Sequence, residues 1–188
     1  PPRSTPLYSS AASDVYKRQA LPTDSATSRK LCMWILEQMG FNPRPVDMGP
    51  DLGQMLERCD GALLIGDRAL DEAARHPELI RMDLGKTWLE LTGFPMVFAV
   101  YAAHRDAPVH ELKQAHNLLQ RQLESYENSV VKRQAIIDST SKRSGFSNER
   151  ITQYFEEVKL RLDSDGEAGL KHFLNQVCDV SDYQIVDI

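Results

Sequence analysis

The sequence predicts an α/β fold, and three observations lead to that class. An uninterrupted apolar run, Ala62–Ile65, stops at Gly66-Asp67, as is typical of a short strand covered on both faces. A second apolar run, Met96–Tyr101, follows Pro95 and predicts another strand. Amphipathic segments lie before and between these runs, and this alternation of helices with strands is the α/β pattern.

Two helices precede the first predicted strand. Ser25 is a favourable N-cap for the first helix, and Gly40 ends it. Its apolar residues recur at helical spacing: Leu31, Trp34, Ile35 and Met39. Pro43–Val46 follows as a short extended segment of poor regularity. The second helix has apolar positions at Leu52, Met55, Leu56 and Cys59.

Two more helices lie between the predicted strands. One runs from about Asp67 to Arg75. The next begins at Asp83 as its cap, buries Trp88 in the core and ends at Thr92-Gly93.

The C-terminal part has a different character, because no strand signal occurs from His104 to Val177. Val109–Ile137 predicts one long helix or two consecutive helices, with Glu124–Asn128 as the place for a break. Ser147 begins another helix, and Ala168–Val177 is the last. These helices have no sheet of their own and need another surface on which to pack.

Composition restricts the class of function. The 188 residues are 41% hydrophobic with a net charge of −5, which argues against a general surface for nucleic acid or anionic membrane. No apolar run approaches the ~18 residues that span a membrane. Cys32, Cys59 and Cys178 are far apart and lack the spacing of a metal site, so we expect thiols in a reducing compartment and no metal.

The first residues are interpreted as foreign to the protein. Ser9–Gln19 reads SSAASDVYKRQ, like a translated sequencing adaptor, and Pro1–Thr5 resembles the adaptor sequence upstream of it. We therefore set residues 1–19 apart as a non-native, disordered segment. The alternative is a disordered native tail rich in serine and proline.

Three places carry candidate functional residues. Ser25, Thr27 and Ser28 offer hydroxyls and free amides at a helix N-terminus, which favours an anion, although spacing alone favours simple capping. Gly66 and Asp67 follow a strand, where α/β sheets bind ligands. Asp67 either hydrogen bonds a substrate hydroxyl or helps its departure as a general acid, or it simply caps the next helix. Thr92 and Gly93 either face a cleft or form a helix terminus.

Two sequence blocks resemble those of a known family. ALLIGDRAL (Ala62–Leu70) and DLGKTWLELTGFPMVFAVY (Asp83–Tyr101) are similar to ALLIGDxAL and DLGxxWxxxTGLPFVFAVW of the chorismate dehydratase family, which acts in the futalosine route to menaquinone. The chain departs from this pattern at Phe94, Met96 and Tyr101.

Two shorter elements add to the resemblance. Ser25–Ser28 matches S-x-T-S, and Gly169–Phe173 matches GL-x-x-F. The resemblance therefore extends from about Leu21 to Val177.

The resemblance implies a two-lobed fold of the type 2 periplasmic-binding-protein kind, of which this chain holds one α/β lobe and C-terminal helices. Residues 20–95 would form the second lobe and 96–103 a crossover strand. Residues 104–188 would pack on the hinge and on a first lobe that is largely missing. We therefore expect exposed apolar surface on the last three helices, and a fragment inactive by itself.

The implied reaction is the dehydration of chorismate to 3-[(1-carboxyvinyl)oxy]benzoate in the cytoplasm, without a cofactor. Ser25, Thr27 and Ser28 would bind one substrate carboxylate. Gly66 and Asp67 would border the ring, with Asp67 as the candidate catalytic residue, and Thr92-Gly93 would contact substrate. The alternatives are the sister 1,4-dihydroxy-6-naphthoate synthase and a non-catalytic module that binds a small anionic solute.

Overall fold

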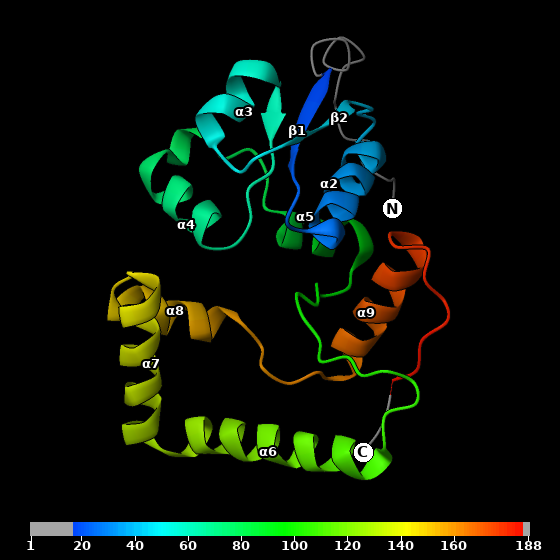
Figure 1. Cartoon of the computed structure of the whole chain (residues 1–188). Coiled ribbons are helices and arrows are strands. Elements are labelled where there is room, and N and C mark those ends of the chain that lie inside the picture. The colour runs from blue at the N-terminus through cyan, green and yellow to red at the C-terminus, as the bar shows by residue number, and fades with distance from the viewer. Residues whose placement is uncertain (1–16, 186–188) are drawn as a thin grey trace, which may run out of the picture. The chain divides into compact units, whose positions relative to one another are not determined.

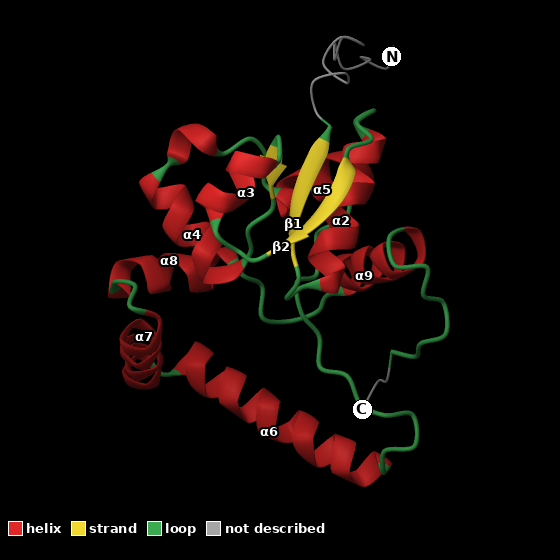
Figure 2. Cartoon of the chain, turned by 45° about the horizontal axis from the view of Figure 1, so that its top comes forward, coloured by secondary structure: helices red, strands yellow, loops and turns green. Residues whose placement is uncertain are grey.

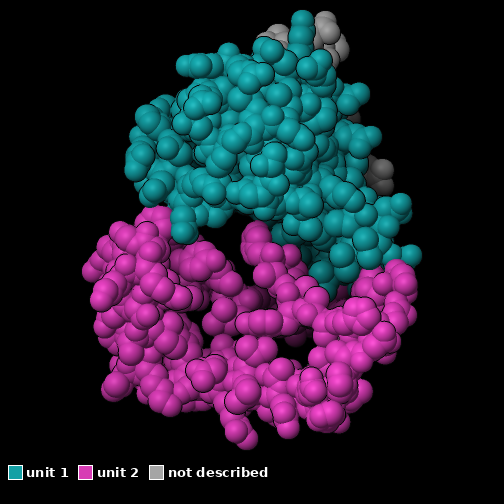
Figure 3. Space-filling view, viewed as in Figure 1, with its two compact units in different colours: residues 1–96, 168–181 teal, residues 97–167, 182–188 magenta. Residues whose placement is uncertain are grey.

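The computed structural model describes residues 17–185 and divides into two compact units, drawn in different colours in Figure 3. Unit 1 comprises residues 1–96 and 168–181, and unit 2 comprises residues 97–167 and 182–188. The fold is mixed α/β and mostly helical, with one small sheet in the described residues. No described helix has the length and apolar character needed to cross a membrane.

Unit 1 contains a three-stranded parallel sheet with the order β2-β1-β3 (Figure 2). The strands are β1 (Arg18–Pro22), β2 (Arg44–Met48) and β3 (Gly61–Ala62). Ala20 of β1 lies opposite Val46 on one side and Ala62 on the other. The first strand in the sequence therefore takes the central place.

The central strand is covered on both faces. Ala20 packs in one buried cluster with Met48, Met55 and Cys59, whereas its neighbour Leu21 packs in another with Cys32, Leu36 and Leu63. Successive side chains of a strand point to opposite faces. Helices α2 (Ala26–Gln38) and α3 (Leu52–Arg58) supply one cluster each, so they cover opposite faces of the sheet (Figure 1).

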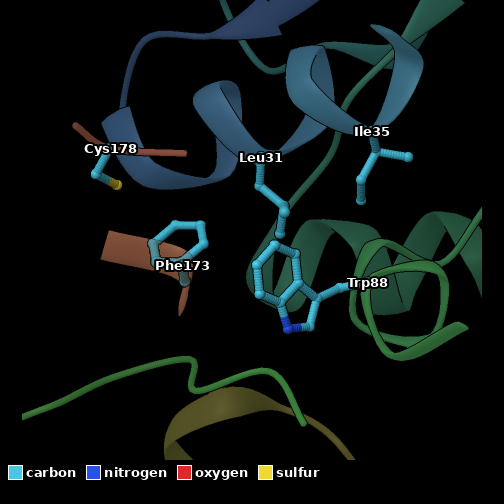
Figure 4. Close-up of a cluster of buried hydrophobic side chains, with 5 residues drawn as sticks. All are labelled: Leu31, Ile35, Trp88, Phe173 and Cys178. Carbon is cyan, nitrogen blue, oxygen red and sulfur yellow. The ribbon is translucent and has the colours of Figure 1, made fainter. Parts of the chain in front are cut away.

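The third buried cluster joins helices that are distant in the sequence. Figure 4 shows Leu31 and Ile35 of α2 directed toward Trp88 of α5 (Leu84–Thr92), with Phe173 of α9 (Ser164–Gln176) beside it. Trp88 is fully buried, and its ring lies 5.8 Å from the ring of Phe173. Its indole nitrogen has no hydrogen-bond partner among the described residues. The prediction of Trp88 as a core residue is confirmed.

The Gly169–Phe173 element has a packing explanation. A Cβ atom added at Gly169 would lie 2.3 Å from the carbonyl oxygen of Pro95. Only glycine permits this close approach of α9 to the loop that follows α5. Residues 168–181 consequently belong to unit 1, whereas the sequence placed them with the other C-terminal helices.

The strands differ most from the sequence predictions. Strand β1 was not predicted, and its Arg18 and Gln19 fall inside the segment 1–19 that was set apart; residues 1–16 lie outside the described residues. The amides of Lys17 and Arg18 donate to the Asp60 carboxylate at 3.0 and 2.8 Å. Residues 18 and 19 are therefore part of the folded unit.

Of the two predicted strands, the first is shorter than predicted and the second is missing. The run Ala62–Ile65 contributes only Ala62 to β3, although the Leu63 amide still donates to the Ala20 carbonyl at 3.0 Å. Met96–Tyr101 forms no strand, and the side chains of Phe98 and Tyr101 are 77% and 86% exposed. By contrast, the segment 43–46 was predicted to be poorly regular, but all of it except Pro43 lies in the regular strand β2. Apolar character alone does not make a strand, because a strand needs a hydrogen-bonding partner.

The helices of unit 1 follow their predicted signals. Ser25 and Asp83 cap α2 and α5, and Gly93 ends α5 with a φ of +77°. Helix α4 (Gly66–Arg75) follows β3, and a single 3₁₀ turn (Pro77–Leu79) comes after it.

Unit 2 consists mainly of three consecutive helices, α6 (Val109–Asn128), α7 (Val130–Ser144) and α8 (Asn148–Glu157). The region forms two consecutive helices, and the break lies at Ser129, the cap of α7, one residue beyond the predicted Glu124–Asn128, which is helical in α6. Ser147 caps α8, as predicted. In the described part of this unit, the buried hydrophobic side chains are Ile137 and Ile151.

Candidate functional site

The predicted site residues at the beginnings of α2 and α4 lie at the carboxyl edge of the sheet. Helix α2 begins shortly after β1 and helix α4 shortly after β3, and these two strands are neighbours. Helix α2, which follows β1, and helix α3, which precedes β3, cover opposite faces of the sheet. In open α/β sheets, ligands bind outside the carboxyl ends of the strands at such a reversal.

The beginning of α2 uses its serines for capping. The Ser25 hydroxyl accepts a hydrogen bond from the Ser28 amide at 3.2 Å and donates to the Ser28 hydroxyl at 2.9 Å. The amides of Ala26 and Thr27 have no hydrogen-bond partner within residues 17–185. These two amides, with the exposed Thr27 hydroxyl, are available to an anion at the positive end of the helix dipole.

The beginning of α4 is open to solvent. Gly66 has a φ of +59°, and an added Cβ would meet no atom within 4 Å. The glycine is therefore needed for its left-handed backbone conformation and not to make room for neighbouring atoms. Asp67 is exposed and lies in the first turn of α4. The expected alternative, that Asp67 caps this helix, is wrong: the cap is Ile65, without a side-chain bond.

One ion pair joins these two helix beginnings. Arg68, in the first turn of α4, donates to the Asp24 carboxylate from the loop before α2 at 2.8 Å. Both side chains are about half exposed, at 50% and 42%. Ser25 and Gly66 are therefore brought to the same edge, although the paired residues are 44 positions apart in the sequence.

Two arginines at this edge were not predicted as site residues from the sequence. Arg68 is one of them. The other, Arg29, donates to the Pro22 carbonyl at 3.4 Å and pairs with Asp47 of β2. Each guanidinium is paired with a carboxylate, Arg29 with Asp47 and Arg68 with Asp24. No local pattern identifies Arg68 at this edge, because its partner Asp24 lies 44 positions away in the sequence.

A pocket of about 410 Å³ lies beside Arg68. It is formed by the loop and helix that follow β2 and by the exposed face of α4. Its lining residues are Pro50, Asp51, Leu52, Gly53, Leu56, Arg68, Asp71, Glu72, His76 and Leu79. None of the predicted site residues lines this pocket.

Thr92 and Gly93 complete a helix terminus. The Thr92 hydroxyl donates to the Trp88 carbonyl at 2.8 Å and accepts from the Phe94 amide at 3.1 Å. The Gly93 amide donates to the Leu89 carbonyl at 2.8 Å. Thr92 and Gly93 take no part in the Arg68–Asp24 ion pair that joins the beginnings of α2 and α4.

Cys32 of α2 lies in the core of unit 1. Burial raises the pKa of the Cys32 thiol to about 12, so this cysteine is not a nucleophile at neutral pH. The described residues contain no group of three or more histidine, cysteine, aspartate or glutamate side chains that could hold a metal ion. At this edge, the free amides of Ala26 and Thr27 are available as hydrogen-bond donors.

Comparisons with known proteins agree with the family resemblance. A sequence family described as menaquinone biosynthesis matches residues 1–178. The chain is similar to the chorismate dehydratase of Thermus thermophilus, with 29% identity over 185 residues. This match covers 90% of the chain and 66% of the relative, so the chain spans just under two thirds of that relative's length.

Proposed function

The chain belongs to the menaquinone biosynthesis family, and on this premise we propose that the whole protein dehydrates chorismate to 3-[(1-carboxyvinyl)oxy]benzoate. The name of the similar Thermus protein supports the reaction. The structural observation that carries the proposal is the pairing of Arg68 with Asp24, which brings two helix beginnings to one edge of the sheet.

The reaction asks for orientation more than for a strong base. Chorismate loses a ring proton and its allylic hydroxyl as one molecule of water, and the ring becomes aromatic. The developing aromaticity drives the step, so the protein has to hold the leaving groups and two carboxylates in place. Backbone amides, hydroxyls and arginines supply such a site.

The beginning of α2 is proposed to bind one carboxylate. The amides of Ala26 and Thr27 would donate to it, and Thr27 would add its hydroxyl, while Ser25 and Ser28 hold the first turn in place. A charge at a helix N-terminus gains about 0.3–1 kcal/mol when exposed, and more when partly buried.

Asp67 is proposed to act at the leaving hydroxyl, either by hydrogen bonding it or by donating a proton. Its exposed position in the first turn of α4 leaves the carboxyl accessible from solvent. Gly66 would border the ring. Thr92 and Gly93 are proposed to contact the substrate only if the rest of the whole protein reaches the end of α5.

The type 2 periplasmic-binding-protein arrangement is part of the same proposal. The unmatched third of the Thermus relative is proposed to correspond to a first lobe that faces unit 1 across the substrate. The 188-residue chain by itself would then bind substrate weakly and fail to convert it. The whole protein would act in the cytoplasm on a small molecule.

The test is a chorismate assay on the whole protein, following loss of the cyclohexadiene absorbance and the product mass. A product lighter by one water supports the dehydratase. Binding without conversion would instead indicate a solute-binding module. If chorismate is neither bound nor converted, the next assay is for the sister naphthoate synthase. Thr27→Val should raise KM for chorismate several-fold, whereas the Thr152→Val substitution in α8 should leave KM unchanged.

A further inference from the structure

Arg29 connects the first turn of α2 with two strands of the sheet. It lies two positions after Thr27, and its amide donates to the Ser25 carbonyl at 3.3 Å. Its guanidinium donates to the Pro22 carbonyl at 3.4 Å and pairs with the Asp47 carboxylate. The side chain is only 25% exposed. One residue therefore links α2 to the ends of both β1 and β2.

The register of the sheet explains why Asp47 meets an arginine from α2. Asp47 of β2 lies opposite Leu21 of β1, and residues directly opposite each other on neighbouring strands point to the same face. Leu21 packs in the cluster that α2 supplies, so Asp47 also points to the face that α2 covers. Asp47 stays 62% exposed because β2 lies at the edge of the described sheet. An exposed ion pair adds little stability, and its main effect here is to fix geometry.

The two groups that Arg29 holds come from neighbouring strands. Nη1 donates to the carbonyl of Pro22, and Nη2 donates to the carboxylate of Asp47. A guanidinium is planar and presents its donors in a fixed fork, whereas a lysine ammonium is a single point of charge. The fork therefore holds the first turn of α2 in one orientation relative to the strand ends.

The free amides of Ala26 and Thr27 lie in this same turn. Ser25 and Ser28 hold the turn internally by capping, whereas Arg29 holds it to the sheet. Donors that are already directed at a ligand need no reorganisation when the ligand binds. The anchoring of the turn therefore decides how well these amides can receive a carboxylate.

We propose that Arg29 is a positioning residue for the substrate carboxylate and that, together with Asp47, it fixes the first turn of α2 over the carboxyl ends of β1 and β2. Because its guanidinium is already paired with Asp47, Arg29 acts through the amides of Ala26 and Thr27 and does not bind the carboxylate itself. This inference rests on the proposed function, of which the carboxylate at α2 is a part.

Steady-state kinetics of the whole protein separate positioning from folding. Arg29→Gln should raise KM for chorismate roughly three- to tenfold with kcat unchanged, because a carboxylate that keeps its bonds is held equally in the ground and transition states. Loss of folded protein alone would lower kcat and leave KM unchanged, and that result would overturn the proposal. Arg75→Gln is the matched control. It removes the same charge from unit 1, but Arg75 pairs with Asp71 and Glu72 of its own helix, so KM should stay unchanged.

Two further variants test whether the ion pair acts as one unit. Arg29→Lys should recover part of the loss, because lysine keeps the charge but not the fork. Asp47→Asn should raise KM as well, and its addition to Arg29→Gln should raise KM no further, because contacting residues are not additive. Fully additive effects would contradict the proposal. Asp47 is also the more exposed partner, so Asp47→Asn provides the comparison if Arg29→Gln does not fold.

The mobility of the amides tests Arg29 independently of the reaction. The NMR order parameters of the Ala26 and Thr27 amides should be about 0.85 in the unsubstituted protein and below about 0.6 in the Arg29→Gln variant. Unchanged order parameters would overturn the role of Arg29 even if the protein dehydrates chorismate. Lowered order parameters in a protein that does not convert chorismate would support the positioning of the amides by Arg29 and reject the proposed reaction.

Discussion

Unit 1 and unit 2 are built from similar amphipathic helices but are stabilised in different ways. Unit 1 has three apolar clusters in which side chains such as Ile35, Met55 and Trp88 are fully buried. In the described part of unit 2, Val130 and Val131 are 78% and 80% exposed. A sheet and a distant helix provide unit 1 with surfaces to bury, whereas consecutive helices provide little.

Polar contacts take a larger share in unit 2. Arg161 donates to both carboxylate oxygens of Glu127 at 3.1 and 2.8 Å and also to Gln120 at 2.8 Å. Arg133 donates to the carbonyls of Tyr126 and Glu127 at the end of α6. Exposed ion pairs contribute little to stability and are screened by salt. The comparison indicates that unit 1 is the more stable unit.

Exposed apolar surface was expected on the last three helices, and the structure meets this expectation on α7 and only partly on α8. The exposed apolar side chains of unit 2 occur on α6 and α7 in particular, and α8 adds Tyr154. The larger ones on these helices are Val109, Leu118, Leu119, Val130, Val131, Ile136 and Tyr154. Helix α9 is different, because Phe173 is buried in unit 1.

The largest expected effect is at the centre of unit 1. Trp88→Ala should destabilise this unit by about 3–5 kcal/mol, because a large fully buried ring is lost and a cavity remains. Urea unfolding with hydrogen exchange of α2 measures it. Val131→Ala, at an exposed position of α7, is the control and should change stability by less than about 0.5 kcal/mol. A loss below about 1 kcal/mol at Trp88 would contradict the comparison.

A smaller effect is expected at the buried position of unit 2. Ile137→Ala should cost about 2 kcal/mol, at the low end for such a substitution, because few other side chains around it are buried. Hydrogen exchange of α7 amides should rise while exchange in β1 stays unchanged. Equally faster hydrogen exchange in both units would show that they unfold together. The two units would then not differ in stability.

Helix caps should contribute similarly in the two units. Ser25→Ala and Ser129→Ala each remove a side chain that accepts a backbone amide at a helix beginning, so each should cost about 1 kcal/mol. The difference lies in ligand binding, since only Ser25 supports the proposed carboxylate site. An equal loss of chorismate affinity in both variants of the whole protein would sink that assignment.

The smallest expected effect is on the stability of unit 2 at acidic pH. The hydrogen bonds from Arg161 hold the pKa of Glu127 below its usual range, so the stabilisation is present above the ordinary glutamate pKa. It is lost as the pH falls through the lowered value of the folded state. In the Glu127→Gln variant, the stability of unit 2 should depend less on pH below about pH 4.5. Added salt should reduce this pH dependence in the unsubstituted chain as well.

Asp60 provides the matching case in unit 1. Hydrogen bonds from the amides of Arg18 and Lys17 hold the pKa of this carboxyl below its usual range. Protonation should therefore loosen the beginning of β1 in acid, with the same sign as at Glu127. Hydrogen exchange of these two amides against pH measures the effect. Because backbone amides and not a cation are the partners, salt should change it less than at Glu127.

Local features of the sequence determined the helices. Ser25, Asp83 and Ser147 cap their helices as predicted, and Gly93 adopts the left-handed conformation that ends α5. Capping and helical periodicity depend on residues within one turn of each other, so a single stretch of sequence contains the information.

The tertiary structure alone decided the strands. The central strand β1 reads RQALP and was not predicted, because Arg18 and Gln19 were set apart as non-native and because its burial comes from neighbours on both sides and not from its own composition. The apolar run Met96–Tyr101 was predicted as a strand but has no partner in the described structure. Strand formation depends on hydrogen bonds to a segment elsewhere in the chain, which no local pattern specifies.

The candidate site divides in the same manner. The sequence by itself determined which residues carry hydroxyls, amides and a carboxylate at the ends of elements: Ser25, Thr27, Ser28, Gly66 and Asp67. Only the tertiary structure decided that Ser25 and Gly66 share one sheet edge, and it added Arg68 through its pairing with Asp24. The reason is physical: chemical character belongs to each residue, whereas proximity across 44 residues depends on the order of strands in the sheet.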